Sequence, residues 1–194
     1  MSWFAPRRPH LAGWWAENFT PEEQATIIEQ FEKYPPLGTT YDVARLPHDA
    51  RFLNNASTWF TRKDMSRVRI RMLDVARTEF EKSGNVADLH YTYMGLENAW
   101  YKLRDEDPSA IATSIEYAES MVAIAPKVSE ALRAEGVWPV TNPGYCRLVV
   151  AYDKQGRWQE AIDLCEQAQK QGWAGDWHAR VERYRKKLDK ARRS

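Results

Sequence analysis

The stretch between residues 143 and 173 constrains the fold most, because two apolar stripes of helical period flank a short turn in it. The first stripe is Tyr145, Leu148, Val149 and Tyr152, and the second is Trp158, Ala161, Ile162, Cys165 and Ala168. Between them, Gly156 can adopt the positive φ angle with which many helices end. The stretch therefore predicts two antiparallel helices, each with one face that needs a neighbouring helix to cover it.

The same stretch resembles the tetratricopeptide repeat, whose pattern is W-x2-L-G-x2-Y, followed by small and aromatic residues on the return helix and then a proline. The positions that match are Tyr145, Leu148 and Tyr152 in the first helix and Ala161 and Ala168 in the second. The departures are Val149 for a small residue, Cys165 for an aromatic one and Trp173 for the proline. The match spans about one sixth of the chain, and a generic αα-hairpin is the alternative interpretation.

An earlier and more degenerate copy of the pattern is expected over residues 91–126. Tyr91, Met94 and Gly95 repeat the spacing of Tyr145, Leu148 and Val149. The return helix is expected to begin after Asp107 and to end at Pro126, where the family's proline falls, with a separate short helix over 127–135. The two copies lie 54 residues apart, which exceeds the roughly 34 residues of a regular repeat.

These patterns together predict an all-α protein made of stacked antiparallel helical hairpins, which the resemblance describes as a right-handed, tetratricopeptide-repeat-like array. Two regions are expected: residues 1–50, an N-terminal arm, helix and long loop packed on the body, and residues 51–194, the helical domain. Thr20, Pro21 and Glu23 predict the start of the N-terminal helix, because they form a capping box with a proline at the first helical position. Asp64 is expected to cap a later helix that extends to about Lys82.

A capping helix is expected at the C-terminus, beginning after Asp176. Its inward stripe is Trp177, Val181, Tyr184 and Leu188. Residues 174–194 contain eight basic and three acidic side chains, which is compatible either with a solvated outer face or with a surface that binds nucleic acid.

The composition excludes several classes of function but does not identify a substrate or a partner. The net charge of +1 gives no global field that would attract nucleic acid or a membrane surface, and no apolar run is long enough to span a bilayer. Cys146 and Cys165 are expected to be reduced thiols in a cytoplasmic protein. We find no phosphate-binding loop, zinc motif or nucleophile motif, so we predict no catalytic residue, metal or cofactor.

The resemblance implies a non-enzymatic scaffold that binds a peptide or a partner helix on a concave surface made by the first helix of each hairpin. The matching lining positions are Thr92, Leu96, Cys146, Val150 and Asp153. Two alternatives stay open: a nucleic-acid-associated protein that uses the basic C-terminal helix, and an enzyme or effector with a site near residues 34–50, where His48 and Asp49 are adjacent. The aromatic N-terminal arm could also join two copies of the chain.

Overall fold

A computed structural model describes residues 16–33 and 49–193 of the chain, and all regular secondary structure in those ranges is helical. The α-helices are α2 (Pro21–Lys33), α3 (Asp49–Ala56), α4 (Ser66–Ser83), α5 (Val86–Lys102), α6 (Ala110–Ala134), α7 (Pro143–Lys154), α8 (Trp158–Gln171) and α9 (Trp177–Arg192). Two short 3₁₀ turns, Ser57–Trp59 and Lys63–Met65, join α3 to α4. The prediction of an all-α fold is confirmed.

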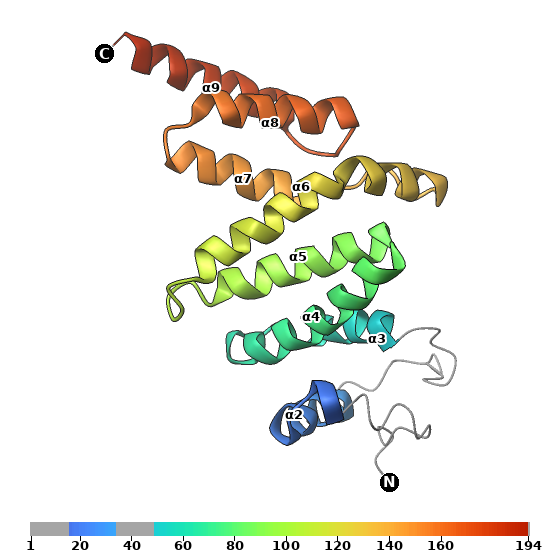
Figure 1. Cartoon of the computed structure of the whole chain (residues 1–194). Coiled ribbons are helices and arrows are strands. Elements are labelled where there is room, and N and C mark those ends of the chain that lie inside the picture. Colours follow the sequence, from blue (N-terminus) through green and yellow to red (C-terminus); the bar gives the residue numbers. More distant parts are fainter. Residues whose placement is uncertain (1–15, 34–48, 194) are drawn as a thin grey trace.

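The helices form a linear stack in which each one packs mainly against its neighbours in sequence, from α3 at one end to α9 at the other (Figure 1). The most extensive contacts are those of α5 with α6, of α4 with α5 and of α8 with α9. At the α3 end of the stack α2 contacts α4, and the Gln30 amide donates a hydrogen bond of 3.0 Å to the Trp59 carbonyl. Local packing of this kind is typical of repeat and solenoid architectures.

The predicted hairpin over 143–173 is present as α7 and α8. Gly156 has a φ angle of +71°, and the Arg157 amide donates to the Tyr152 carbonyl at 2.9 Å, which ends α7 with the six-residue hydrogen bond of a Schellman motif. Gly172, with a φ angle of +80°, ends α8 in the same way and turns Trp173 back into the core, where its side chain is buried. The turn residues therefore act as the sequence predicts.

Three of the predicted helix starts can be compared with the structure. One is confirmed, one is wrong, and one has the right position but a different hydrogen bond. The capping box of α2 forms, because the Thr20 amide donates to Glu23 at 2.9 Å and the Glu23 amide donates to the Thr20 hydroxyl at 3.3 Å. The prediction that Asp64 caps α4 is wrong: Asp64 lies within the second 3₁₀ turn and α4 begins later, at Ser66. Asp176 occupies the cap position of α9, but its carboxylate accepts from Arg180 at 2.5 Å instead of from the backbone.

The prediction that Pro126 ends a helix is also wrong, because α6 continues through it to Ala134 and contains the expected short helix over 127–135. A proline inside a helix removes one backbone hydrogen bond and clashes with the preceding turn. That cost is offset by a buried stripe that runs unbroken past the proline. Its members are Met121, Ala125, Val128 and Leu132.

Successive hairpins approach each other closely where α7 begins. A Cβ atom placed on Gly144 would lie 2.7 Å from the Ala118 carbonyl oxygen and 2.8 Å from the Met121 Cβ, so only glycine fits against α6 at this position. Within the α7–α8 hairpin, Ala161 and Ala168 are fully buried, as the small-residue pattern predicts. The stack is therefore held at a short interhelical spacing by small side chains.

Candidate functional site

The structure corrects two of the predicted lining residues. Thr92 and Leu96 each have an exposed fraction of 0%, so they cannot contact a partner at the surface. The reason is the position of α5, which packs against α4 on one side and α6 on the other and buries most of its circumference. The Thr92 hydroxyl donates to the Asp88 carbonyl of its own helix at 2.8 Å.

The remaining three predicted residues lie on α7 and differ in accessibility. Val150 is 41% exposed. Cys146 is half-buried, and burial raises the pKa of its thiol. Asp153 is bound by other helices, because its carboxylate accepts from Lys187 of α9 at 2.5 and 2.8 Å and from the Trp158 indole at 3.1 Å. Val150 is thus the predicted residue most available to a partner.

A stripe on α5 outside the predicted lining is more accessible than Thr92 and Leu96. Its members are Tyr91, Met94, Asn98 and Tyr101, at helical spacings of three, four and three residues. Tyr91 is 37% exposed and Asn98 is also exposed, whereas Met94 and Tyr101 are half-buried. The signal that could have identified this stripe is the second apolar period of α5. We name these four residues together with Val150 the α5–α7 face.

The two helices of this face are joined by a buried ion pair. Glu97 of α5, only 4% exposed, accepts a hydrogen bond from the Nε of Arg147 of α7. The Arg147 guanidinium also stacks over the Tyr101 ring, 3.7 Å from its centroid. Burial raises the pKa of the Glu97 carboxyl, while Arg147 acts in the opposite direction. This pair links α5 to α7 across the boundary between hairpins.

At the α3 end of the face, a pocket of about 320 Å³ opens between α3, α4 and α5. The residues that line it are Asn54, Asn55, Ser57, Thr58, Arg69, Asp88, Tyr91, Met94 and Gly95. On its acidic side, the Asp88 carboxylate is bound by Arg51 at 2.6 and 2.9 Å and by the Asn85 amide at 2.7 Å. Its lining residues thus combine one tyrosine and one methionine with two amide side chains, one guanidinium and one carboxylate.

Arg69 gives this pocket its electrostatic character. Its Nη1 donates to the Asn98 side-chain oxygen at 3.1 Å, but its Nε is buried without a hydrogen-bond partner, and no carboxylate of the described residues lies within ion-pair distance of it. Burial lowers the pKa of Arg69. Burial also lowers the pKa of Lys102, and the nearby charge of Arg69 lowers it further. Arg69 and Lys102 therefore lie near enough for their positive charges to interact.

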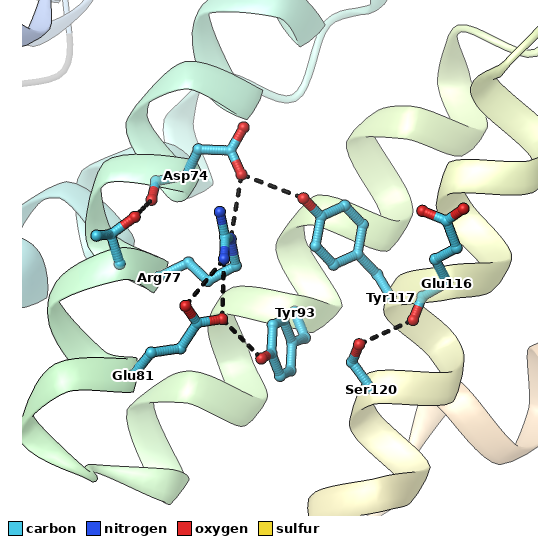
Figure 2. A network of polar contacts seen from close by, with 8 residues as sticks. Asp74, Arg77, Glu81, Tyr93, Glu116, Tyr117 and Ser120 are labelled. Carbon is cyan, nitrogen blue, oxygen red and sulfur yellow. Dashed lines mark hydrogen bonds and ion pairs between the residues drawn. The ribbon is translucent and has the colours of Figure 1, made fainter.

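A second polar cluster, shown in Figure 2, joins α4, α5 and α6. Arg77 binds Asp74 at 3.3 Å and Glu81 at 2.9 Å. The Tyr117 hydroxyl donates to Asp74 at 3.1 Å and the Tyr93 hydroxyl donates to Glu81 at 3.0 Å. Burial is the largest cause that raises the pKa of both tyrosines, to about 12 for Tyr93. Because these groups bind one another, the cluster joins three helices and we assign it a structural role.

One of the sequence-based alternatives places a site near residues 34–50, and another expectation concerns the aromatic N-terminal arm. His48 lies outside the part of the chain that the structure describes, as do most of the 34–50 loop and the aromatic residues of the N-terminal arm. Within residues 16–33 and 49–193, no group of three or more His, Cys, Asp or Glu side chains is arranged to hold a metal ion. In the same ranges, no helix combines the length and apolar character that crossing a bilayer requires.

Comparison of the chain with protein-family models, with curated proteins and with solved structures found no match to any of them.

Proposed function

We propose that this protein is a non-enzymatic interaction module, built of tetratricopeptide-repeat-like helical hairpins, that binds a peptide or partner helix on its α5–α7 face. The observation that carries the proposal is the partly exposed stripe of Tyr91, Met94 and Tyr101 on α5, together with the exposed Val150 of α7. Aromatic and methionine side chains are enriched where protein surfaces bind other proteins. Stacked helical hairpins also present extended surfaces suited to such partners.

The ion pair between Glu97 and Arg147 supports this assignment, because it keeps α5 and α7 in a constant relation and so presents their side chains on a rigid platform. A rigid platform reduces the conformational entropy lost on binding. Asp153 and Lys187 make the corresponding connection between α7 and α9. In this proposal Asp153 positions helices and does not contact the partner.

The ion pairs of α9 favour a capping role over nucleic-acid binding. Four of the seven basic residues of α9 bind carboxylates: Arg180, Arg183, Arg185 and Lys187. The partners of Arg185 and Lys187 include Glu166 of α8 and Asp153 of α7. Phosphate binding draws on cations that are free to replace counterions, so the paired charges leave fewer of them for that use.

The proposal is tested by affinity capture from a native lysate at two salt concentrations, with three forms of the full chain. These are the wild type, a Tyr91→Ser/Val150→Ser double variant and an Ile111→Ser control, whose mutated residue is 51% exposed on α6. We expect the same proteins to bind the wild type and the control, and to be lost with the double variant. Capture that is equal for all three forms, or that depends on nucleic acid and collapses in salt, would contradict the proposal.

The predicted cytoplasmic location stays a prediction. It is compatible with Cys146 and Cys165, which are both free thiols, since disulfides are rare in reducing compartments.

A further inference from the structure

We infer that the α3–α5 pocket binds the side-chain carboxylate of an aspartate or glutamate in the partner peptide, with Arg69 as the recognising cation. The inference rests on the proposed function and specifies the chemistry of the partner at one end of the α5–α7 face. The carboxylate would enter beside Tyr91 and reach the guanidinium that the pocket contains.

Arg69 differs from the other arginines of similar burial. Four arginines of the described residues are half-buried, namely Arg69, Arg77, Arg147 and Arg180. The last three each bind a carboxylate, within 3.3 Å or less. Arg69 donates to the side-chain oxygen of Asn98, which is neutral, and its buried Nε has no hydrogen-bond partner. Removing a charged group from water is costly unless an opposite charge compensates it, so Arg69 is the arginine that lacks its anion.

The surroundings of Arg69 add positive potential instead of cancelling it. Burial and, in addition, the nearby positive charge of Arg69 lower the pKa of Lys102. The Lys102 ammonium donates to the Thr61 carbonyl, which is neutral. Asp88, the carboxylate that lines the pocket, is already bound by Arg51 at 2.6 Å. An anion that enters the pocket would therefore meet the Arg69 guanidinium with no carboxylate of the described residues already bound to it.

Neutral donors complete the site. The Asn54 and Asn55 side chains line the pocket, and no intramolecular hydrogen bond is seen for either amide within the described ranges. A carboxylate can accept from a guanidinium through one oxygen and from amide groups through the other. The pocket is thus lined by residues of α3 and α4 whose side chains can donate hydrogen bonds to an anion.

The same composition argues against a phosphate or a nucleic acid as the ligand. Asp88 borders the pocket and would repel a dianion more strongly than a monoanion. Nucleic-acid binding depends on several phosphate contacts along a strand, whereas Arg69 is the one basic residue among those that line the pocket. Met94 and the backbone of Gly95 supply an apolar surface for the methylene groups of an acidic side chain.

The test is an NMR titration of the full-length, ¹⁵N-labelled protein that observes the Arg69 Nε–H signal. The probes are the tripeptides acetyl-Ala-Glu-Ala-amide and acetyl-Ala-Gln-Ala-amide, with inorganic phosphate and acetyl-Ala-Ala-Ala carrying a free C-terminal carboxylate as further arms. The Arg69 signal is identified by its loss in Arg69→Gln. We expect the glutamate peptide to shift it saturably with a Kd of roughly 1–10 mM, and the glutamine peptide to bind at least about tenfold more weakly.

Two variants support the titration. Arg67→Gln on the same helix is the matched control, because Arg67 is exposed and pairs with Asp107 at 3.5 Å outside the pocket; it should leave binding unchanged. Asn54→Ala retains the Arg69 signal and should weaken binding severalfold, which keeps the test valid even if Arg69→Gln lowers stability.

Several results would overturn the inference. One is that the Arg69 signal does not shift at up to about 20 mM peptide. A second is that the glutamate and glutamine peptides shift it equally. A third is that phosphate or the free C-terminal carboxylate binds more tightly than the glutamate peptide. Failure of the inference is separable from failure of the proposed function. If the tripeptide does not bind but the Tyr91→Ser/Val150→Ser variant still loses captured proteins, only the carboxylate assignment is wrong.

Discussion

The contact between α6 and α7 can be tested by replacing Gly144 with alanine. The new Cβ would lie 2.7 Å from the Ala118 carbonyl oxygen, which is backbone and cannot move without shifting α6. Overpacking of this kind costs about 1–3 kcal/mol, while replacing glycine in a helix returns up to about 1 kcal/mol. Gly144 lies in the first turn of α7, where replacing glycine stabilises the helix only slightly. We therefore expect the free energy of unfolding to decrease by about 1–2 kcal/mol.

Gly95→Ala is the matched control, since it makes the same chemical change against a softer neighbour. Its Cβ would lie 2.8 Å from the Leu73 Cδ1, the end of a flexible side chain that can rotate away. Urea unfolding followed by circular dichroism gives the free energy of unfolding of both variants. In thermal melts, 1 kcal/mol corresponds to about 2–4 °C for a chain of this size. The packing argument fails if Gly144→Ala is as stable as wild type, or if Gly95→Ala is the more damaging change.

Three further predictions concern buried charge, pH and the thiols. Glu97→Ala should lower the free energy of unfolding by about 2–3 kcal/mol, because it leaves Arg147 partly buried without its anion; an unchanged urea midpoint contradicts this. Burial lowers the pKa of His90 to about 4 from its usual 6.5. The unfolded chain therefore binds a proton that the folded chain does not, and stability should fall as the pH decreases from 6.5 to 4. His90→Phe should reduce that dependence, and identical pH profiles would refute the assignment. Burial raises the pKa of Cys165 to about 11 and also raises that of Cys146, so both should react slowly with a thiol reagent until unfolding; rapid labelling of native Cys165 contradicts its packing.

The features that could be predicted from the sequence are those encoded over a few residues. The capping box of Thr20 and Glu23 and the glycine turns at Gly156 and Gly172 are local, so their hydrogen bonds follow from residue type and spacing. The helical stripes of α7 and α8 likewise specify which faces are buried. Each of these agrees with the structure.

The errors arise where tertiary contacts outweigh a local signal. Pro126 is a helix-ending residue by itself, yet the buried stripe on both sides of it keeps α6 continuous. Thr92 and Leu96 were placed on the surface by a repeat pattern, whereas the neighbours of α5 on both sides bury them. Both cases show how far packing between helices can override the tendency of one residue.

The α3–α5 pocket could not be predicted because its residues are distant in sequence. Asn54, Arg69 and Tyr91 belong to three helices, and no spacing rule relates them. A sequence also cannot show that one arginine lacks an anion while three others of similar burial have one. That contrast appears only when the ion pairs of the folded chain are compared.

The central claim is that the α5–α7 face contacts a partner protein, and site-specific photocrosslinking tests it most directly. A photoreactive phenylalanine derivative is placed at Tyr91 or Val150, with Ile111 on α6 as the control position, and the full chain is irradiated in native lysate. We predict discrete protein adducts from Tyr91 and Val150 that are absent from Ile111 and are reduced by Glu97→Ala, which releases α5 from α7. Adducts that form equally at Ile111, or none at Tyr91 and Val150, would contradict the account.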